Sequence, residues 1–194
     1  MRIGVTGGIG SGKSYVCRLL AQHWQMPVYD CDHEAKRLMN TSQTLCRQLK
    51  ELIGEHAYDA DGHIDKTVMS RYLFSDAAHV RVINAIVHPA VKSDFEAWAA
   101  RHEGDVVMES AILVEAGLRD AVDLLIVIDA PLTLRLQRAM LRDGATEEQI
   151  RARIRHQMSP AALREQADYI VVNDGRSLMK QLTNIIHSIN KIQC

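Results

Sequence analysis

The sequence predicts an α/β protein with a doubly wound parallel sheet of about five strands. Two observations carry this prediction. Short runs of aliphatic and β-branched residues alternate along the chain with longer segments of helical character. Most of these runs are apolar throughout, which is typical of strands buried on both faces of a parallel sheet.

Five runs are expected to form the strands. In chain order they are Arg2–Thr6, Val28–Asp30, Val106–Glu109, Leu124–Asp129 and Tyr169–Asn173. Their spacing is uneven, because long helical stretches separate the second from the third and the fourth from the fifth. We therefore predict one folded unit, with a core of 1–30, 104–130 and 165–194. A helical insertion covers 31–103, and a smaller helical insertion covers 131–164.

Helices are expected between the strands and throughout both insertions. Before the last strand they are Tyr15–His23, Asp32–Asn40, Gln43–Ile53, Thr67–Phe74, Ala77–Arg101 and Pro131–Arg142, and Leu178–Lys191 follows the last strand. Pro89 disfavours a helical conformation at His88, so the helix there should end or kink. Asp143-Gly144 breaks the helix in the smaller insertion, and Thr146-x-x-Gln149 is a capping-box start for the next.

The composition is that of an ordinary globular domain, with 47% hydrophobic and 24% charged residues. The 23 basic and 24 acidic residues leave a net charge of −1, which argues against a nucleic-acid or membrane-surface binder. No apolar run reaches the roughly 20 residues that span a bilayer. We expect a cytoplasmic monomer or small homo-oligomer whose thiols stay reduced (Cys17, Cys31, Cys46 and Cys194).

The segment from Gly7 to Ser14, G-G-I-G-S-G-K-S, fits the phosphate-binding P-loop pattern between a strand and a helix. Its glycines allow backbone angles and close approaches that a Cβ would block. Successive N–H groups and the helix N-terminus then favour an anion. The loop therefore predicts a nucleoside triphosphate site, formed by Gly8, Gly10, Ser11, Gly12, Lys13, Ser14 and Tyr15.

Each polar group of this loop has an expected role. Lys13 would reach the β- and γ-phosphates, and the Ser14 hydroxyl would bind Mg²⁺. The N–H of Tyr15 is placed for the α-phosphate. A GTPase is disfavoured because no N-K-x-D motif follows, and no strand ends in the Asp-Glu pair of many water-activating ATPases.

Asp30 and Asp32 flank Cys31 at the end of the second strand. Two carboxylates at this spacing share a strand face, at the edge where α/β sheets bind ligands. Asp32 is the better candidate for a catalytic base, and Asp30 the second. The alternative is structural, since Asp32 could instead cap the following helix.

The smaller insertion carries a cluster of arginines. Arg135, Arg138 and Arg142 fall on one helical face at i, i+3 and i+7. A solvated face is the ordinary explanation, but within the cluster only Glu147-Glu148 balances the charge. A lid whose arginines, Arg138 and Arg142, neutralise a transferred phosphoryl group is the functional alternative.

These motifs together resemble the dephospho-CoA kinase family. The resemblance rests on T-G-G-I-G-S-G-K-S at 6–14, D-C-D at 30–32, D-G-H-I-D-K at 61–66, H-P at 88–89, A-I-L-V-E-A-G at 111–117, R-A-M-L-R at 138–142, Gln157 and A-D-Y-I-V-V-N at 167–173. It implies a P-loop kinase fold that uses ATP to phosphorylate the ribose 3′-hydroxyl of dephospho-CoA. The 31–103 insertion would then bind this acceptor, and 131–164 would be the lid.

The resemblance also implies residue roles. The base falls on Asp32, the phosphate-loop lysine on Lys13 and the lid arginine on Arg142. Asn173 would lie near the ATP base, and the acceptor would meet Thr6, Asp32, Lys36 and His88. Three positions depart from the family pattern: Ala111 replaces a proline, Lys66 an arginine, and Tyr15 a threonine.

Two other functions remain open from the sequence. Another small-molecule P-loop kinase, of the shikimate or nucleoside type, shares the loop and the D-x-D pattern. The 31–103 insertion is longer than an acceptor as small as shikimate or a nucleoside would require. A non-catalytic ATP-binding regulatory module is the non-enzyme alternative, and it predicts nucleotide binding without acceptor-dependent turnover.

Overall fold

The computed structural model describes residues 1–193, so Cys194 lies outside the described part of the chain. The chain divides into two compact units. The sheet unit contains 1–29 and 101–194, and the helical unit contains 30–100. Cys17, Cys31 and Cys46 are not joined in disulfides. Among the described helices, none is both long and apolar enough to cross a membrane.

A five-stranded sheet forms the centre of the sheet unit, in the order β2-β3-β1-β4-β5. The strands are β1 Arg2–Thr6, β2 Val28–Asp30, β3 Val106–Glu109, β4 Leu124–Asp129 and β5 Tyr169–Val172. The recorded pairs of β1 with β3 and β4, and of β4 with β5, are parallel. The predicted fold class is thus confirmed, and the fifth strand ends one residue earlier than expected.

The register brings the carboxyl ends of the central strands to one edge. Val5 of β1 pairs with Glu109 of β3, and Thr6 pairs with Val127 of β4. Asp129, the last residue of β4, pairs with Val172 of β5. This is the edge where open α/β sheets bind their ligands.

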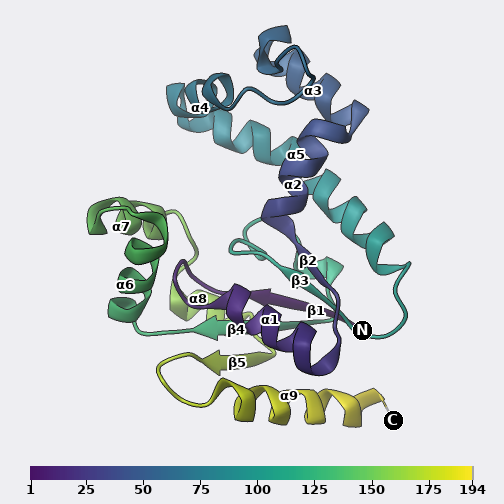
Figure 1. Cartoon of the computed structure of the whole chain (residues 1–194), viewed down its shortest axis with the longest axis vertical. Coiled ribbons are helices and arrows are strands. Elements are labelled where there is room, and N and C mark those ends of the chain that lie inside the picture. The colour runs from purple at the N-terminus through teal and green to yellow at the C-terminus, as the bar shows by residue number, and fades with distance from the viewer. Residues whose placement is uncertain (194) are drawn as a thin grey trace. The chain divides into compact units, whose positions relative to one another are not determined.

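Helices cover both sides of this sheet (Figure 1). Those of the sheet unit are α1 Lys13–Trp24, α6 Leu132–Asp143, α7 Glu147–Arg155, α8 Pro160–Glu165 and α9 Leu178–Gln193, with a short 3₁₀ turn at Arg119–Ala121. Helices α1 and α9 bury their apolar faces in one core with β1 and β4, through Leu20, Leu182, Ile3 and Ile126. The strand residues that belong to this core are apolar because helices cover this face of the sheet.

The helical unit contains four helices within its described residues: α2 Cys31–Thr41, α3 Gln43–Ile53, α4 Lys66–Ser75 and α5 Ala77–Ala99, with a 3₁₀ turn at Glu55–Ala57. Each starts at a residue whose side chain accepts backbone N–H groups: Asp30, Ser42, Asp65 and Asp76. Such caps satisfy donors that lack a partner within the helix.

A helix end or a kink was expected at His88, and the helix does not end there, because α5 runs through Pro89. Pro89 lies on the exposed side of the helix, whereas Val87, Val91 and Phe95 are buried. These residues form one stripe at intervals of four, before and after the proline. Their burial offsets the hydrogen bond that proline removes from the helix.

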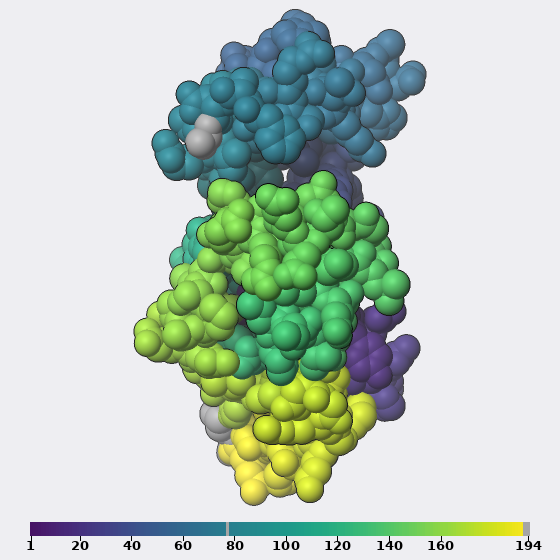
Figure 2. All heavy atoms as spheres, turned by 90° about the vertical axis from the view of Figure 1, so that its left-hand side faces the viewer, coloured from purple at the N-terminus to yellow at the C-terminus, as the bar shows by residue number. Residues whose placement is uncertain are grey.

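The smaller insertion has the predicted helix break. Gly144 follows α6 in the left-handed conformation, at φ 61°. Thr146 and Gln149 form a complete capping box at the start of α7, with both reciprocal hydrogen bonds present. Helices α6 and α7 lie at the surface of the sheet unit that Figure 2 turns toward the viewer.

Candidate nucleotide site

The predicted P-loop spans the gap between β1 and α1. Gly7, Gly10 and Gly12 have φ angles of 152°, 76° and 98°, in the region that favours glycine. The turn closes through a 3.0 Å hydrogen bond from the Ser11 N–H to the Gly8 carbonyl. The loop therefore has the backbone that a phosphate cradle requires.

Neighbouring side chains leave no space for a Cβ at two of the loop glycines. A Cβ on Gly8 would lie 2.0 Å from a terminal nitrogen of Arg135, and one on Gly12 would lie 2.2 Å from Nδ2 of Asn173. Glycine is therefore required in this loop for two reasons. Positive φ angles favour it at Gly7, Gly10 and Gly12, and side chains from outside the loop occupy the space of a Cβ at Gly8 and Gly12.

Two hydroxyl groups at this site are buried without a hydrogen-bond partner among the described atoms. They are Oγ1 of Thr6, the last residue of β1, and Oγ of Ser11, inside the loop. A buried hydroxyl without a partner costs free energy. Hydroxyls of this kind, in and beside a glycine-rich loop at the N-terminus of α1, fit a site that a phosphate completes.

The loop serine has a carboxylate partner that sequence reasoning missed. The Ser14 hydroxyl donates a 2.6 Å hydrogen bond to Oε1 of Glu109, which is 9% exposed at the end of β3. The signal available in the sequence was that Glu109 is the last residue of a predicted strand. A serine hydroxyl and a carboxylate are oxygen ligands of the kind that Mg²⁺ prefers. Within 1–193, no group of three or more His, Cys, Asp or Glu side chains is arranged to hold a metal ion.

Asn173 contacts the P-loop directly. Its Nδ2 donates a 2.8 Å hydrogen bond to the Ser11 carbonyl, and its own N–H donates to the Asp129 carbonyl at 2.7 Å. Arg138 donates to the carbonyl and Oδ1 of Asn173 at 3.3 and 3.4 Å. The structure thus brings two of the predicted residues together with the loop.

The three arginines on α6 have different surroundings. Arg135 is 5% exposed, and its Nε donates to the Ile9 carbonyl at 2.9 Å. Burial lowers its pKa, and the charge of Asp129 opposes that shift. Arg142 is exposed and forms an ion pair with Asp143 at 2.7 Å. The hydrogen bond from Arg142 raises the pKa of Arg142 and lowers that of Asp143.

The charge of the arginine cluster is balanced more fully than the sequence suggested. Asp143 also pairs with Arg153 at 2.8 Å, and Glu147 pairs with Arg151 at 2.7 Å. Glu147 and Glu148 are therefore not the only balancing charges within the cluster, because Asp143 pairs with both Arg142 and Arg153. Exposed pairs of this type contribute little to stability.

Two cavities lie at the ends of β4 and β5 in the sheet unit. One of about 240 Å³ is lined by Gly8, Asp129, Arg135, Gln157 and Met158, among others. The other, about 380 Å³, shares Asp129 and Arg135 and extends to Arg164 and Asp174. Arg164 forms an ion pair with Asp129 at 2.5 Å.

The helical unit contains the remaining predicted residues. The carboxylate of Asp30 accepts the N–H groups of Asp32 and His33 at 2.9 and 3.1 Å, so Asp30 is the cap of α2. Asp32 is not the cap, and its side chain is exposed in the first turn. Lys36 is exposed on the same helix, and burial lowers the pKa of His88 on α5.

Comparison with known proteins decides the family. The family model described as dephospho-CoA kinase matches residues 1–178. The chain belongs to the dephospho-CoA kinase family. A dephospho-CoA kinase of Bacteroides fragilis strain YCH46 is 42% identical over 189 residues, covering 96% of this chain and 91% of the relative.

Solved structures agree with the family's fold. A crystal structure of a Thermus thermophilus protein has a TM-score of 0.82 and 31% identity, covering 97% of this chain and 96% of that one. A shikimate kinase from Acinetobacter baumannii in complex with shikimate has a TM-score of 0.57 at 19% identity, covering 98% and 93%. The second similarity shows a shared fold and no more.

Proposed function

We propose that this protein transfers the γ-phosphoryl group of ATP to the ribose 3′-hydroxyl of dephospho-CoA, giving coenzyme A and ADP. Membership of the dephospho-CoA kinase family carries this proposal. The phosphate cradle supports it, since Thr6 and Ser11 present buried hydroxyls without partners beside the loop.

The donor half of the site is proposed to bind ATP through the P-loop. Lys13 would neutralise the β- and γ-phosphates, and the N–H groups of Gly8, Gly10, Gly12 and Tyr15 would donate to phosphate oxygens. In the structure the Tyr15 N–H donates to the Gly12 carbonyl at 3.1 Å. Tyr15 needs only its backbone here, which suits a side chain that is 50% exposed.

Ser14 and Glu109 would hold Mg²⁺, which would supply positive charge to neutralise the phosphates. The direct Ser14–Glu109 hydrogen bond supports this pairing. Asn173 contacts the loop at the Ser11 carbonyl, and Arg138 contacts Asn173.

The acceptor half is proposed to lie in the 31–103 insertion, with Lys36 and His88 as contacts. Asp32 accepts the proton of the 3′-hydroxyl as that oxygen bonds to the γ-phosphorus and ADP leaves. The capping of α2 by Asp30 supports this assignment, because it leaves the Asp32 carboxylate available. The 131–164 segment is proposed as the lid, with Arg142 neutralising the transferred group.

An ADP-release assay with three acceptors tests the proposal. Purified protein with ATP and Mg²⁺ receives dephospho-CoA, shikimate or a nucleoside, and phosphorus NMR locates the added phosphate. We expect turnover with dephospho-CoA and a product phosphorylated on the 3′ oxygen. Turnover with shikimate or a nucleoside alone would overturn the proposal, as would ATP binding without turnover on any acceptor.

A further inference from the structure

Ile9 is the one large apolar residue inside the glycine-rich loop. A phosphate cradle uses the backbone of this segment and does not need an isoleucine side chain. The structure shows where each part of Ile9 goes. Its side chain packs against a small apolar cluster formed by Leu136, Ala139 and Ile150 of α6 and α7.

Both backbone groups of Ile9 are also hydrogen-bonded to side chains. The Ile9 N–H donates to Oε1 of Gln157 at 2.9 Å. The Ile9 carbonyl accepts from Nε of Arg135 at 2.9 Å. All three contacts come from the single segment 135–157, far from the loop in the sequence.

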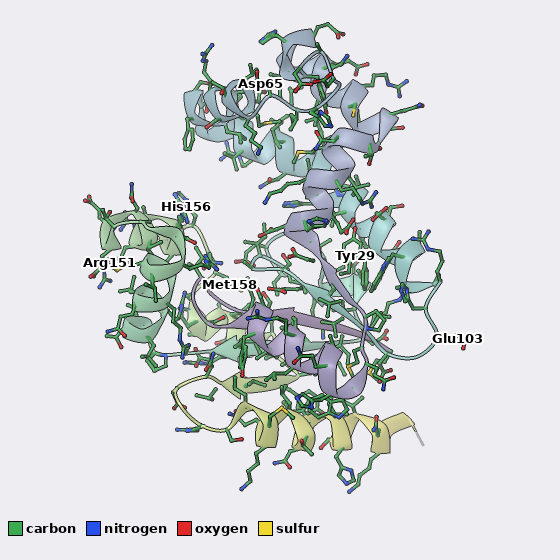
Figure 3. All side chains as sticks on the ribbon, in the orientation of Figure 1. Tyr29, Asp65, Glu103, Arg151, His156 and Met158 are labelled. Atoms are coloured by element: carbon green, nitrogen blue, oxygen red, sulfur yellow. The ribbon has the colours of Figure 1, made fainter. Side chains whose placement is uncertain are left out.

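The side-chain amide of Gln157 also forms a hydrogen bond away from the loop. Its Nε2 donates to the Ala111 carbonyl at 3.0 Å, just beyond the end of β3. The next residue, Met158, labelled in Figure 3, donates its N–H to Oε1 of Glu115 at 2.8 Å. The side-chain amide of Gln157 therefore connects the P-loop to the β3 side of the site. Arg135 is equally constrained, because it is 5% exposed and its guanidinium faces Gly8.

We propose that Arg135, Gln157 and the cluster Leu136–Ala139–Ile150 form a clamp on Ile9 that holds the P-loop ready for phosphate before ATP binds. Arg135 and Gln157 are then positioning residues that act through the loop backbone. A glycine-rich loop has many accessible conformations, and fixing one of them in advance lowers the entropic cost of binding. The clamp rests on the proposed function only in taking ATP as the ligand of this loop.

The direct test is Gln157→Leu, which removes both hydrogen bonds of the amide. Gln137→Leu is the matched control, since Gln137 is exposed on α6. Binding of a non-hydrolysable ATP analogue is measured by calorimetry, together with KM for ATP and for dephospho-CoA. We expect Gln157→Leu to weaken analogue binding about tenfold, or about 1.4 kcal/mol. KM for dephospho-CoA and the control variant should change less than twofold.

A second variant keeps the test informative if Gln157→Leu folds poorly. Ile9→Ala removes the side chain from the cluster and leaves both backbone hydrogen bonds possible, whereas Ile9→Val keeps most of the packing. Analogue binding should weaken in the alanine variant and return in the valine variant. Hydrogen exchange of the free protein should become faster across 7–12 in both Ile9→Ala and Gln157→Leu.

Three outcomes are decisive. A lower melting temperature with unchanged analogue affinity and unchanged exchange across 7–12 would overturn the clamp and leave a structural role alone. Wild-type protein that binds the analogue but does not phosphorylate dephospho-CoA would overturn the proposed function and leave the clamp standing. Wild-type protein that does not bind the analogue would overturn both.

Discussion

Gly12→Ala is expected to destabilise the protein through two separate contributions. Gly12 has a φ of 98°, where an alanine costs about 1–2 kcal/mol. Its new Cβ would also lie 2.2 Å from Nδ2 of Asn173, whose amide must then move. That movement breaks the 2.8 Å hydrogen bond to the Ser11 carbonyl, which costs about 1 kcal/mol more. We expect a total of about 2–3 kcal/mol, or a melting temperature about 5–10 °C lower.

Gly104→Ala separates the two contributions. Gly104 has a similar φ of 89°, but a Cβ there meets nothing within 4 Å. It should therefore show the backbone cost alone, about 1 kcal/mol less than Gly12→Ala in urea denaturation. In an Asn173→Ala background, Gly12→Ala should cost the same as Gly104→Ala. Equal costs for the two glycine variants in the wild-type background would refute the Asn173 contribution.

Four further predictions concern the proposed base, the arginines, pH and the lid. Asp32→Asn should lower kcat far more than tenfold while the ATP analogue still binds; activity within tenfold, about 1.4 kcal/mol of barrier, removes Asp32 as the base. Arg142→Met should reduce kcat but change stability little, because its ion pair is exposed. A larger loss of kcat in Arg138→Met would assign the lid role to Arg138 instead. Burial lowers the pKa of His88, so as the pH falls the unfolded chain binds a proton at this residue before the folded protein does. The free energy of unfolding should therefore decrease as the pH drops below about 6.5. A His88→Gln variant with the same pH profile as the wild type would contradict this. Hydrogen exchange across 136–160 should slow with ATP analogue plus dephospho-CoA, and identical exchange with and without both ligands argues against lid closure.

Much of the fold could be predicted because its signals are local. The strands appear as short apolar runs, and the capping box at Thr146 and the break at Gly144 depend on residues within one or two turns. The proline in α5 shows where a local rule fails. The local preference at His88 is outweighed by burial of the apolar stripe that includes Val87 and Phe95 and continues across the proline.

Part of the candidate site could also be predicted from the sequence. The loop residues Gly7 to Ser14 follow from a pattern of eight consecutive positions whose backbone chemistry is known. Arg138 and Asn173 were chosen from the sequence, but their mutual contact was not. Arg135 appeared in the sequence only as one arginine on a charged face, and the structure shows it almost completely buried.

By itself, the sequence determined the α/β class, the phosphate loop and the resemblance to dephospho-CoA kinases, since each depends on residue order and local spacing. Only the tertiary structure showed which distant side chains meet that loop. Glu109 reaches Ser14 across 95 positions, Gln157 reaches Ile9 across 148, and Asn173 reaches Ser11 across 162. No periodic pattern in the sequence indicates these pairs. They meet because parallel pairing brings the carboxyl ends of β1, β3, β4 and β5 to one edge, where the loop is held from outside by side chains that follow those strands.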